Sequence, residues 1–231
     1  MVGRKSEFDE YSHNYQSLVN NFLHFSGLTV DFFTQGKADF LNSLLKNKEK
    51  HSLLDVGCGV GDLHKFLATK ERNILGVDVS SESIKIEKDA NPQNTYSVYD
   101  GKVLPFADNT FDAVSTVCVM HRVPPIQWQT FIQEMVRVVK KQGLVAIFEH
   151  NPFNPLTRVA VNRCPFDKEA VLLKAKQVER MLLLTGQIIP ISHYIFFTPF
   201  KNNFFRKLDG FLSWLTLGAQ YLYIRLETVV L

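Results

Sequence analysis

Three glycines at alternate positions, Gly57, Gly59 and Gly61, follow directly on a short apolar run from Ser52 to Val56. Glycine adopts backbone conformations with positive φ that other residues avoid, so this spacing predicts a sharp turn. The segment from Leu63 to Thr69 has the pattern of a helix. A buried strand, a glycine turn and a helix in succession indicate an α/β fold whose backbone can approach a ligand closely.

The alternation of strands and helices continues along the chain. The predicted strands are largely continuous apolar runs, which is typical of a parallel sheet covered by helices on both faces. We expect further strands at residues 73–79, 95–99, 111–119, 144–149, 187–197 and 219–226. We expect helices within residues 8–45, after Ser80, from Pro124 to Val138, from Pro165 or Asp167 to Gly186, and from Asn202 to Leu217, with a loop over residues 150–158.

Composition excludes several classes of protein. The chain has 231 residues, of which 45% are hydrophobic, so it can bury a full core. Its formal charge of +3 gives no case for nucleic-acid binding. The three cysteines are widely spaced and show no metal-ligand spacing, so we expect no metal site. Their odd number and wide spacing suit a reduced, cytoplasmic protein. Because the first residues of the sequence are polar and charged, we expect no secretory signal peptide, and no apolar run is long enough to span a membrane.

Three acids come at or beside the ends of predicted strands: Asp55, Asp78 and Asp100. Ligands of such sheets bind beyond the carboxyl ends of the strands. Asp78 is placed to accept hydrogen bonds from both ribose hydroxyls, and Asp100 from an adenine amino group. A dinucleotide-dependent oxidoreductase is the main rival interpretation. The GxGxG spacing and Asp55 count against it, because Asp55 would repel a pyrophosphate but suits the ammonium group of S-adenosylmethionine.

The segments LLDVGCGVGDL (53–63), GVDVS (76–80) and YDGKVLPFADNTFDAV (99–114) resemble, in this order and spacing, the motifs of class I S-adenosylmethionine-dependent methyltransferases. They are most similar to the small-molecule enzymes called methyltransferase type 11, and FDEYSHNY and HNPFNPLTR resemble a bacterial biosynthetic subgroup. The resemblance implies a Rossmann-like fold with a seven-stranded sheet of order 3-2-1-4-5-7-6, strand 7 antiparallel, and helices on both faces. We expect one domain over residues 1–231, with an N-terminal helical cap (1–50), a cofactor-binding core (51–150) and a C-terminal part with acceptor-side elements (151–231).

The resemblance also implies the cofactor, S-adenosylmethionine, with S-adenosylhomocysteine as product. In that family the first-motif glycines cradle the methionine part and the acid after the second strand holds the ribose. The implied cofactor-binding residues are Asp55, Gly57, Cys58, Gly59, Gly61, Asp78, Val79, Asp100, Gly101, Val117 and Tyr15. Structural alternatives are a helix cap for Asp78, a turn for Asp100, core packing for Cys58 and a packing stripe for Tyr15.

His121 and His150 follow the fourth and fifth strands, where the methyl acceptor sits in this fold, and are the candidate catalytic residues. His121 is either a general base or orienting group, or a packing histidine. It should point toward the donor methyl if it is catalytic. For His150, the alternative is a hydrogen-bond network that stabilises the loop containing Pro152 and Pro155.

The predicted function is methyl transfer to a small-molecule or glycan/lipid-type biosynthetic acceptor by in-line displacement. Its alternatives are a non-catalytic S-adenosylmethionine-binding or scaffold protein and, less favoured, a nucleotide-dependent oxidoreductase. Residues 201–217 carry one apolar stripe and either pack on the sheet or form a lid over the acceptor, with membrane contact as a third interpretation. We expect a monomer or a homodimer.

Overall fold

The computed structural model describes residues 29–45, 51–67, 72–164, 167–186, 189–197 and 211–226. Its centre is a seven-stranded sheet of order β3-β2-β1-β4-β5-β7-β6. Strands β1 to β5 are parallel, and β7 is antiparallel to both of its neighbours. The strand order and the antiparallel last strand are therefore confirmed. The strands are β1 (His51–Val56), β2 (Arg72–Asp78), β3 (Thr95–Val98), β4 (Phe111–Val117), β5 (Val139–His150), β6 (Ile189–Ile195) and β7 (Gln220–Leu226).

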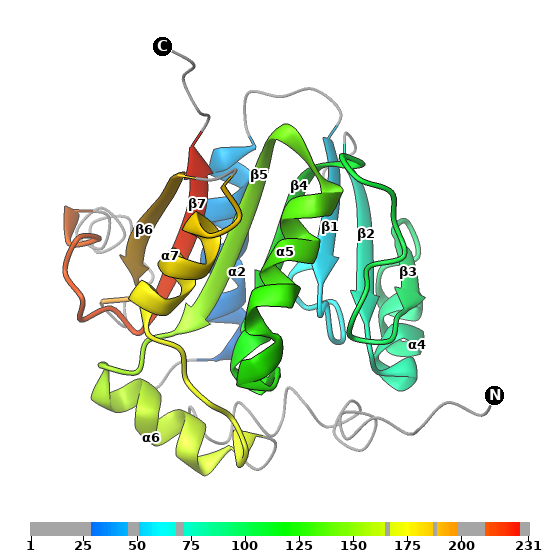
Figure 1. Cartoon of the computed structure of the whole chain (residues 1–231). Coiled ribbons are helices and arrows are strands. Elements are labelled where there is room, and N and C mark those ends of the chain that lie inside the picture. Colours follow the sequence, from blue (N-terminus) through cyan, green and yellow to red (C-terminus); the bar gives the residue numbers. More distant parts are fainter. Residues whose placement is uncertain are drawn as a thin grey trace.

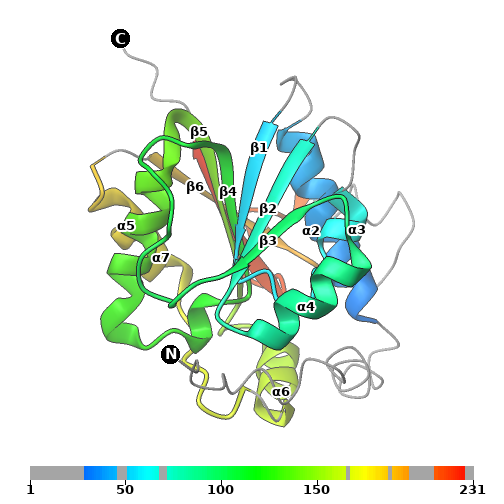
Figure 2. The ribbon, with the colours of Figure 1, turned by 90° about the vertical axis from the view of Figure 1, so that its right-hand side faces the viewer.

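Helices cover both faces of the sheet, also as expected. On one face lie α2 (Val30–Leu44), α3 (His64–Leu67) and α4 (Ser81–Ala90), and on the other α5 (Trp128–Val138) and α7 (Ala175–Leu183) (Figure 2). A sixth described α-helix, α6 (Pro155–Arg163), lies below the carboxyl ends of the parallel strands (Figure 1).

Neighbouring residues of each strand face opposite cores. Leu53 packs in the core beneath α2 and α3, whereas Leu54 packs in the core beneath α5 and α7. The same alternation separates Phe148 from Ile147 on β5. This burial on both faces explains why the strands are continuous apolar runs. It also fixes the register between neighbouring strands, so that the carboxyl ends of the parallel strands lie at the same edge of the sheet.

Local signals start two of the helices. The Ser80 side chain accepts a hydrogen bond from the Ser83 N–H and caps α4. The Asn154 side chain caps α6 by accepting from the Thr157 N–H at 2.9 Å, and Pro155 occupies the first helical position. The loop predicted over residues 150–158 is therefore wrong from Pro155 onward. An Asn-Pro pair begins a helix here, because proline's fixed φ suits the first turn.

Two other helix predictions need correction. The helix before Gly186 begins at Ala175 and not at Pro165 or Asp167, and residues 171–174 are irregular. Residues 212–217 form turns and not a helix, while residues 201–210 lie outside the described residues. The predicted helical stripe across 202–217 is consequently wrong in its described half. No described helix is both long and apolar enough to cross a membrane.

Candidate active site

The glycine turn joins β1 to α3 at the carboxyl edge of the sheet. Gly57, Gly59 and Gly61 all have positive φ, at 78°, 59° and 75°. The Gly57 N–H donates to the carbonyl of Val77 at 2.7 Å, which ties the turn to β2. A Cβ atom at Gly59 would meet nothing within 4 Å, so the space beside this residue is open. The turn thus presents bare backbone to a ligand at Gly59.

Asp78 ends β2 beside that open space. Its Oδ2 accepts from the Gly59 N–H at 2.9 Å, and its Oδ1 accepts from the Ser80 N–H at 2.8 Å. Burial raises the pKa of Asp78, and the N–H groups of Ser80 and Gly59 oppose that rise. The carboxylate therefore lies at the junction of the glycine turn and the start of α4.

Asp100, Gly101 and Val79 lie further along the same edge. Asp100 is exposed, and its Oδ1 accepts from the Lys102 and Val103 N–H groups at 2.8 and 3.1 Å, which lower its pKa. Gly101 has φ +76°, and a Cβ there would lie 3.0 Å from Val79. The side chain of Asp100 therefore stabilises a turn, and its contact with an adenine amino group stays a prediction.

A buried charge cluster supports the glycine turn from below. Asp55 accepts from the Ser115 hydroxyl at 2.8 Å and lies 3.1 Å from Nε2 of His64. The opposite ring nitrogen, Nδ1, lies 2.6 Å from Glu87. Burial alone would lower the pKa of His64, but the hydrogen bonds to Asp55 and Glu87 outweigh it and raise that pKa to about 9.

This cluster changes the role of Asp55. Its side chain is buried, and both carboxylate oxygens are engaged inside the protein. Asp55 therefore lies beneath the turn, bonded to Ser115 and His64, and its contact with the amino group of the donor stays a prediction. Cys58 also lies beneath the turn, because its sulfur would be 2.8 Å from a Cβ atom at Gly76. Burial raises the pKa of the Cys58 thiol well above its usual value.

His121 lies in a second buried cluster, after β4. Its Nδ1 is 2.9 Å from Glu149 and its Nε2 is 3.4 Å from Asp167, which also accepts from Arg122. Burial alone would lower the pKa of His121, but the charge of Glu149 and the hydrogen bonds to Asp167 and Glu149 raise it to about 9. A histidine protonated at neutral pH cannot act as a general base. The ring of His121 is enclosed between two carboxylates, which favours its structural alternative, and its orientation toward the donor methyl stays a prediction.

His150 ends β5 next to this cluster. Its ring centroid lies 5.0 Å from that of His121. Burial and the charge of His121 lower the pKa of His150 to about 3, so its ring is neutral at physiological pH. Val117 ends β4 and is partly buried. Tyr15 lies outside the described residues, and within the described ranges no three His, Cys, Asp or Glu side chains are grouped to hold a metal ion.

Residues 54–147 match the family model for the methyltransferase domain. This match covers the glycine turn, Asp78, Asp100 and His121, and the strand order is the one that the resemblance to class I methyltransferases implied. This part of the chain is a class I methyltransferase domain.

Two curated relatives agree with the methyltransferase domain. An uncharacterized methyltransferase of Synechocystis is 34% identical over 103 residues, covering 44% of this chain and 49% of the relative. The 2-methyl-6-phytyl-1,4-hydroquinone methyltransferase of Synechocystis is 30% identical over 129 residues, covering 52% of this chain and 40% of the relative. The chain thus spans half or less of the length of these curated relatives.

A solved structure extends the likeness in fold beyond the methyltransferase domain match. It is a SAM-dependent methyltransferase from Thermotoga maritima with 16% sequence identity and a TM-score of 0.67, covering 96% of this chain and 98% of that one. At this identity the likeness shows the fold alone.

The cofactor of a class I methyltransferase domain is S-adenosylmethionine, and the carboxyl edge fits it. The open space at Gly59 leaves room beside the backbone for the methionine part. Asp78 lies within hydrogen-bond distance of that same residue, where a ribose would follow. Further along the same edge, Val79 lies 3.0 Å from the position of a Cβ at Gly101, so these two residues are neighbours where an adenine would be expected.

Sequence reasoning missed His64 and Glu87 as members of the site. Their only local signal is periodicity: His64 precedes buried Leu67 by three residues, and Glu87 follows buried Ile84 by three. Polar residues on the buried faces of two helices have to find partners. The identity of those partners depends on how α3 and α4 pack and is not readable from either segment alone.

Proposed function

We propose that this protein transfers a methyl group from S-adenosylmethionine to a small-molecule acceptor. The observation that carries the proposal is the pairing of open backbone at Gly59 with the carboxylate of Asp78 at 2.9 Å. We further propose the donor roles given by the family: the glycines for the methionine part, Asp78 for the ribose, and Val79 with Gly101 for the adenine. When bound, the donor supplies a sulfonium-activated methyl, whose carbon bonds to the acceptor nucleophile as the S–CH3 bond breaks.

The chain's own contribution is position and exclusion of water. Holding two reactants in line contributes about 7–11 kcal/mol to lowering such a barrier. Val119, whose side chain lies against the position of a Cβ at Gly57, closes the space between the turn and the end of β4. Of the two histidines, His121 already carries a proton, and the pKa of His150 is lowered to about 3, so we propose that His150 orients the acceptor by a hydrogen bond and does not take its proton.

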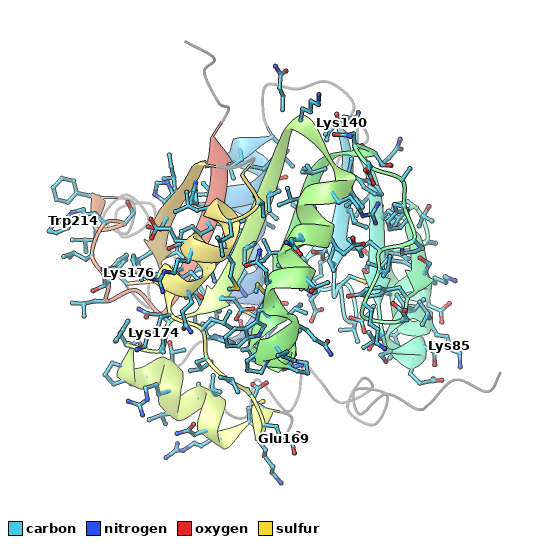
Figure 3. All side chains as sticks on the ribbon, viewed as in Figure 1. Lys85, Lys140, Glu169, Lys174, Lys176 and Trp214 are labelled. Atoms are coloured by element: carbon cyan, nitrogen blue, oxygen red, sulfur yellow. The ribbon has the colours of Figure 1, made fainter. Side chains whose placement is uncertain are left out.

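The acceptor proposed here is amphipathic, such as a glycan- or lipid-type biosynthetic intermediate. Large apolar side chains are exposed beside the carboxyl edge: Phe153 at 56% and Leu156 at 62% by α6, and Leu217 at 61%. Trp214, three residues before Leu217, is 72% exposed. Figure 3 shows Trp214 projecting away from the body of the protein. The Asn154 side chain donates to the carbonyl of Leu217 at 2.8 Å, which joins the two apolar segments. An apolar surface beside a polar site suits a molecule with both characters.

Calorimetry and a labelled-methyl assay test these proposals. Adenosylhomocysteine should bind and NAD should not. Methyl-labelled S-adenosylmethionine, incubated with the protein and a small-molecule extract, should transfer label to products that partition into organic solvent. Binding without any transfer would favour the non-catalytic alternative, and binding of NAD alone would favour the oxidoreductase. Label that stays in the water phase would contradict the amphipathic acceptor only.

A further inference from the structure

Four polar side chains from four elements meet at the carboxyl edge, on the side of β4, β5 and β7. Lys37 comes from α2, Cys118 from the end of β4, His150 from β5 and Gln220 from β7. The Nζ atom of Lys37 lies 3.6 Å from the sulfur of Cys118. The Nε2 atom of Gln220 lies 3.5 Å from the same sulfur and 3.5 Å from Nδ1 of His150. We call these four residues the Lys37 cluster.

The Lys37 cluster lacks a strong hydrogen-bond acceptor for a buried cation. Lys37 is only 6% exposed, on the buried face of α2. In the part of the chain that the structure describes, the one acceptor in reach of its ammonium is the Cys118 thiol, which is a weak acceptor. A buried charge without a matching partner costs several kcal/mol. The position therefore suits an oxygen brought by a ligand.

Gln220 is a second, independent case of a buried polar side chain in this cluster whose hydrogen-bonding capacity is not fully used. Its side chain is 5% exposed, and its Oε1 is buried without a hydrogen-bond partner among the described residues. Its amide N–H group faces the weak sulfur acceptor that Lys37 also faces. Two donors thus converge on one thiol, and an unused acceptor lies beside them. A ligand with an anionic oxygen next to a hydroxyl or N–H would satisfy all three.

The Lys37 cluster is next to the donor turn. Cys118 precedes Val119, the residue that packs against Gly57. Cys118 has φ +56°, a conformation that costs energy for a residue other than glycine. Its N–H donates to the carbonyl of Phe148 at 2.8 Å, which holds it in place. Cys118 is thereby held next to Val119, whose side chain lies against the glycine turn at Gly57.

We propose that Lys37 and Gln220 form the subsite that receives an ionised oxygen of the methyl acceptor, a carboxylate or a phenolate. This inference rests on the proposed methyl transfer and names the acceptor class of that site. Lys37 and Gln220 donate to the anionic oxygen and fix the orientation of the acceptor beside Val119. Neither residue exchanges a proton with the acceptor in this role.

Fluorine NMR on protein loaded with adenosylhomocysteine tests the subsite. The probes are 4-fluorobenzoate, 3-fluoro-4-nitrophenolate and the neutral 4-fluorobenzamide. The wild-type protein should bind at least one anionic probe about tenfold more tightly than the amide, as one charge-assisted hydrogen bond requires. Whichever anion is preferred distinguishes a carboxylate from a phenolate. No binding preference for either anion over the amide would overturn the proposal.

Matched variants identify the cation. Lys37→Met should abolish the preference for the anion, whereas Lys65→Met should retain it, because Lys65 is an exposed lysine paired with Asp31 of α2. Methionine replaces an ammonium that has only a thiol partner, so Lys37→Met without ligand should melt at or above the wild-type temperature. An unchanged anion preference in folded Lys37→Met, or a marked loss of its melting temperature, would overturn the role given to Lys37.

The two proposals fail differently. If wild-type protein does not bind adenosylhomocysteine, the proposed methyl transfer falls. The anion preference is then measured on ligand-free protein, where its presence supports the subsite and its absence overturns it.

Discussion

Nδ1 of His121 lies 2.9 Å from Oε2 of Glu149, and neither side chain is exposed to solvent. The other oxygen of Glu149 accepts from the Met120 N–H at 2.7 Å. These bonds tie the short helix η4 (Met120–Arg122), which follows β4, to the end of β5. Replacing His121 with alanine would leave Glu149 buried without its cation.

We expect His121→Ala to lower the free energy of unfolding by about 3–5 kcal/mol, the cost of breaking a buried ion pair. The affinity of the remaining folded protein for adenosylhomocysteine should be nearly unchanged. Urea denaturation and calorimetry measure the two effects. Glu149→Gln is the milder control, since its amide oxygen can still accept from Met120. Wild-type stability in His121→Ala, together with lost turnover, would return His121 to a catalytic role.

Stability should decline at alkaline pH. His64 and His121 each have a pKa raised from 6.5 to about 9. A raised pKa means that the folded state holds its proton more tightly than the unfolded chain. The resulting stabilisation is complete below about pH 6.5 and is lost as pH rises through about 9. The urea midpoint should therefore fall between about pH 7 and about pH 9.5. A double variant, His64→Gln with His121→Gln, should show a flatter decline, and an equally steep one would contradict these assignments.

Asp78 and Asp100 form a matched pair of acids along one edge. We expect Asp78→Asn to weaken adenosylhomocysteine binding tenfold or more, because a charge-assisted hydrogen bond contributes about 1.5–3 kcal/mol. Asp100→Asn should have a smaller effect, since Asp100 is exposed to water, whereas Asp78 is buried beside the glycine turn and accepts from the Gly59 N–H. Isothermal titration calorimetry compares the two variants. Equal losses of affinity would refute the distinction between them.

Alanine variants of Gly59 and Gly61 should differ in what they lose: the first should lose mainly donor binding, and the second should also lose stability. Both have positive φ, so alanine at either position strains the backbone by about 1 kcal/mol or more. A methyl at Gly59 meets no atom within 4 Å, whereas one at Gly61 collides with the Glu87 side chain. Gly59→Ala should therefore fold and lose donor binding, while Gly61→Ala should lose an additional 1–3 kcal/mol or so of stability. Thermal melts with and without adenosylhomocysteine check this order, and a more stable Gly61→Ala than Gly59→Ala would contradict it.

Much of the fold could be predicted from the sequence because its signals are local. Each buried strand is an apolar run, and the glycine turn and Asp78 lie within segments that carry a family motif. The helix at Pro155 was missed for a local reason as well. Two prolines and two asparagines in five residues indicate a loop, but Asn154 and Pro155 form a helix start.

The buried clusters could not be predicted because they join residues far apart in the sequence. Lys37 meets Cys118 across 81 residues, and Gln220 meets the same cysteine across 102. No local sequence pattern around any of these residues marks it as part of a site. The antiparallel insertion of β7 between β5 and β6 brings Gln220 to the carboxyl edge. Only the completed sheet, with α2 packed on it, places the four side chains together.

A crystal structure of the protein with adenosylhomocysteine tests the central claim most directly. The account predicts that the ribose hydroxyls lie within hydrogen-bond distance of Asp78 and that the homocysteine part lies beside Gly59. Its sulfur should face Val119 and the Lys37 cluster. A nucleoside bound away from Asp78, or an adenosylhomocysteine-soaked crystal whose carboxyl edge stays empty, would contradict the account.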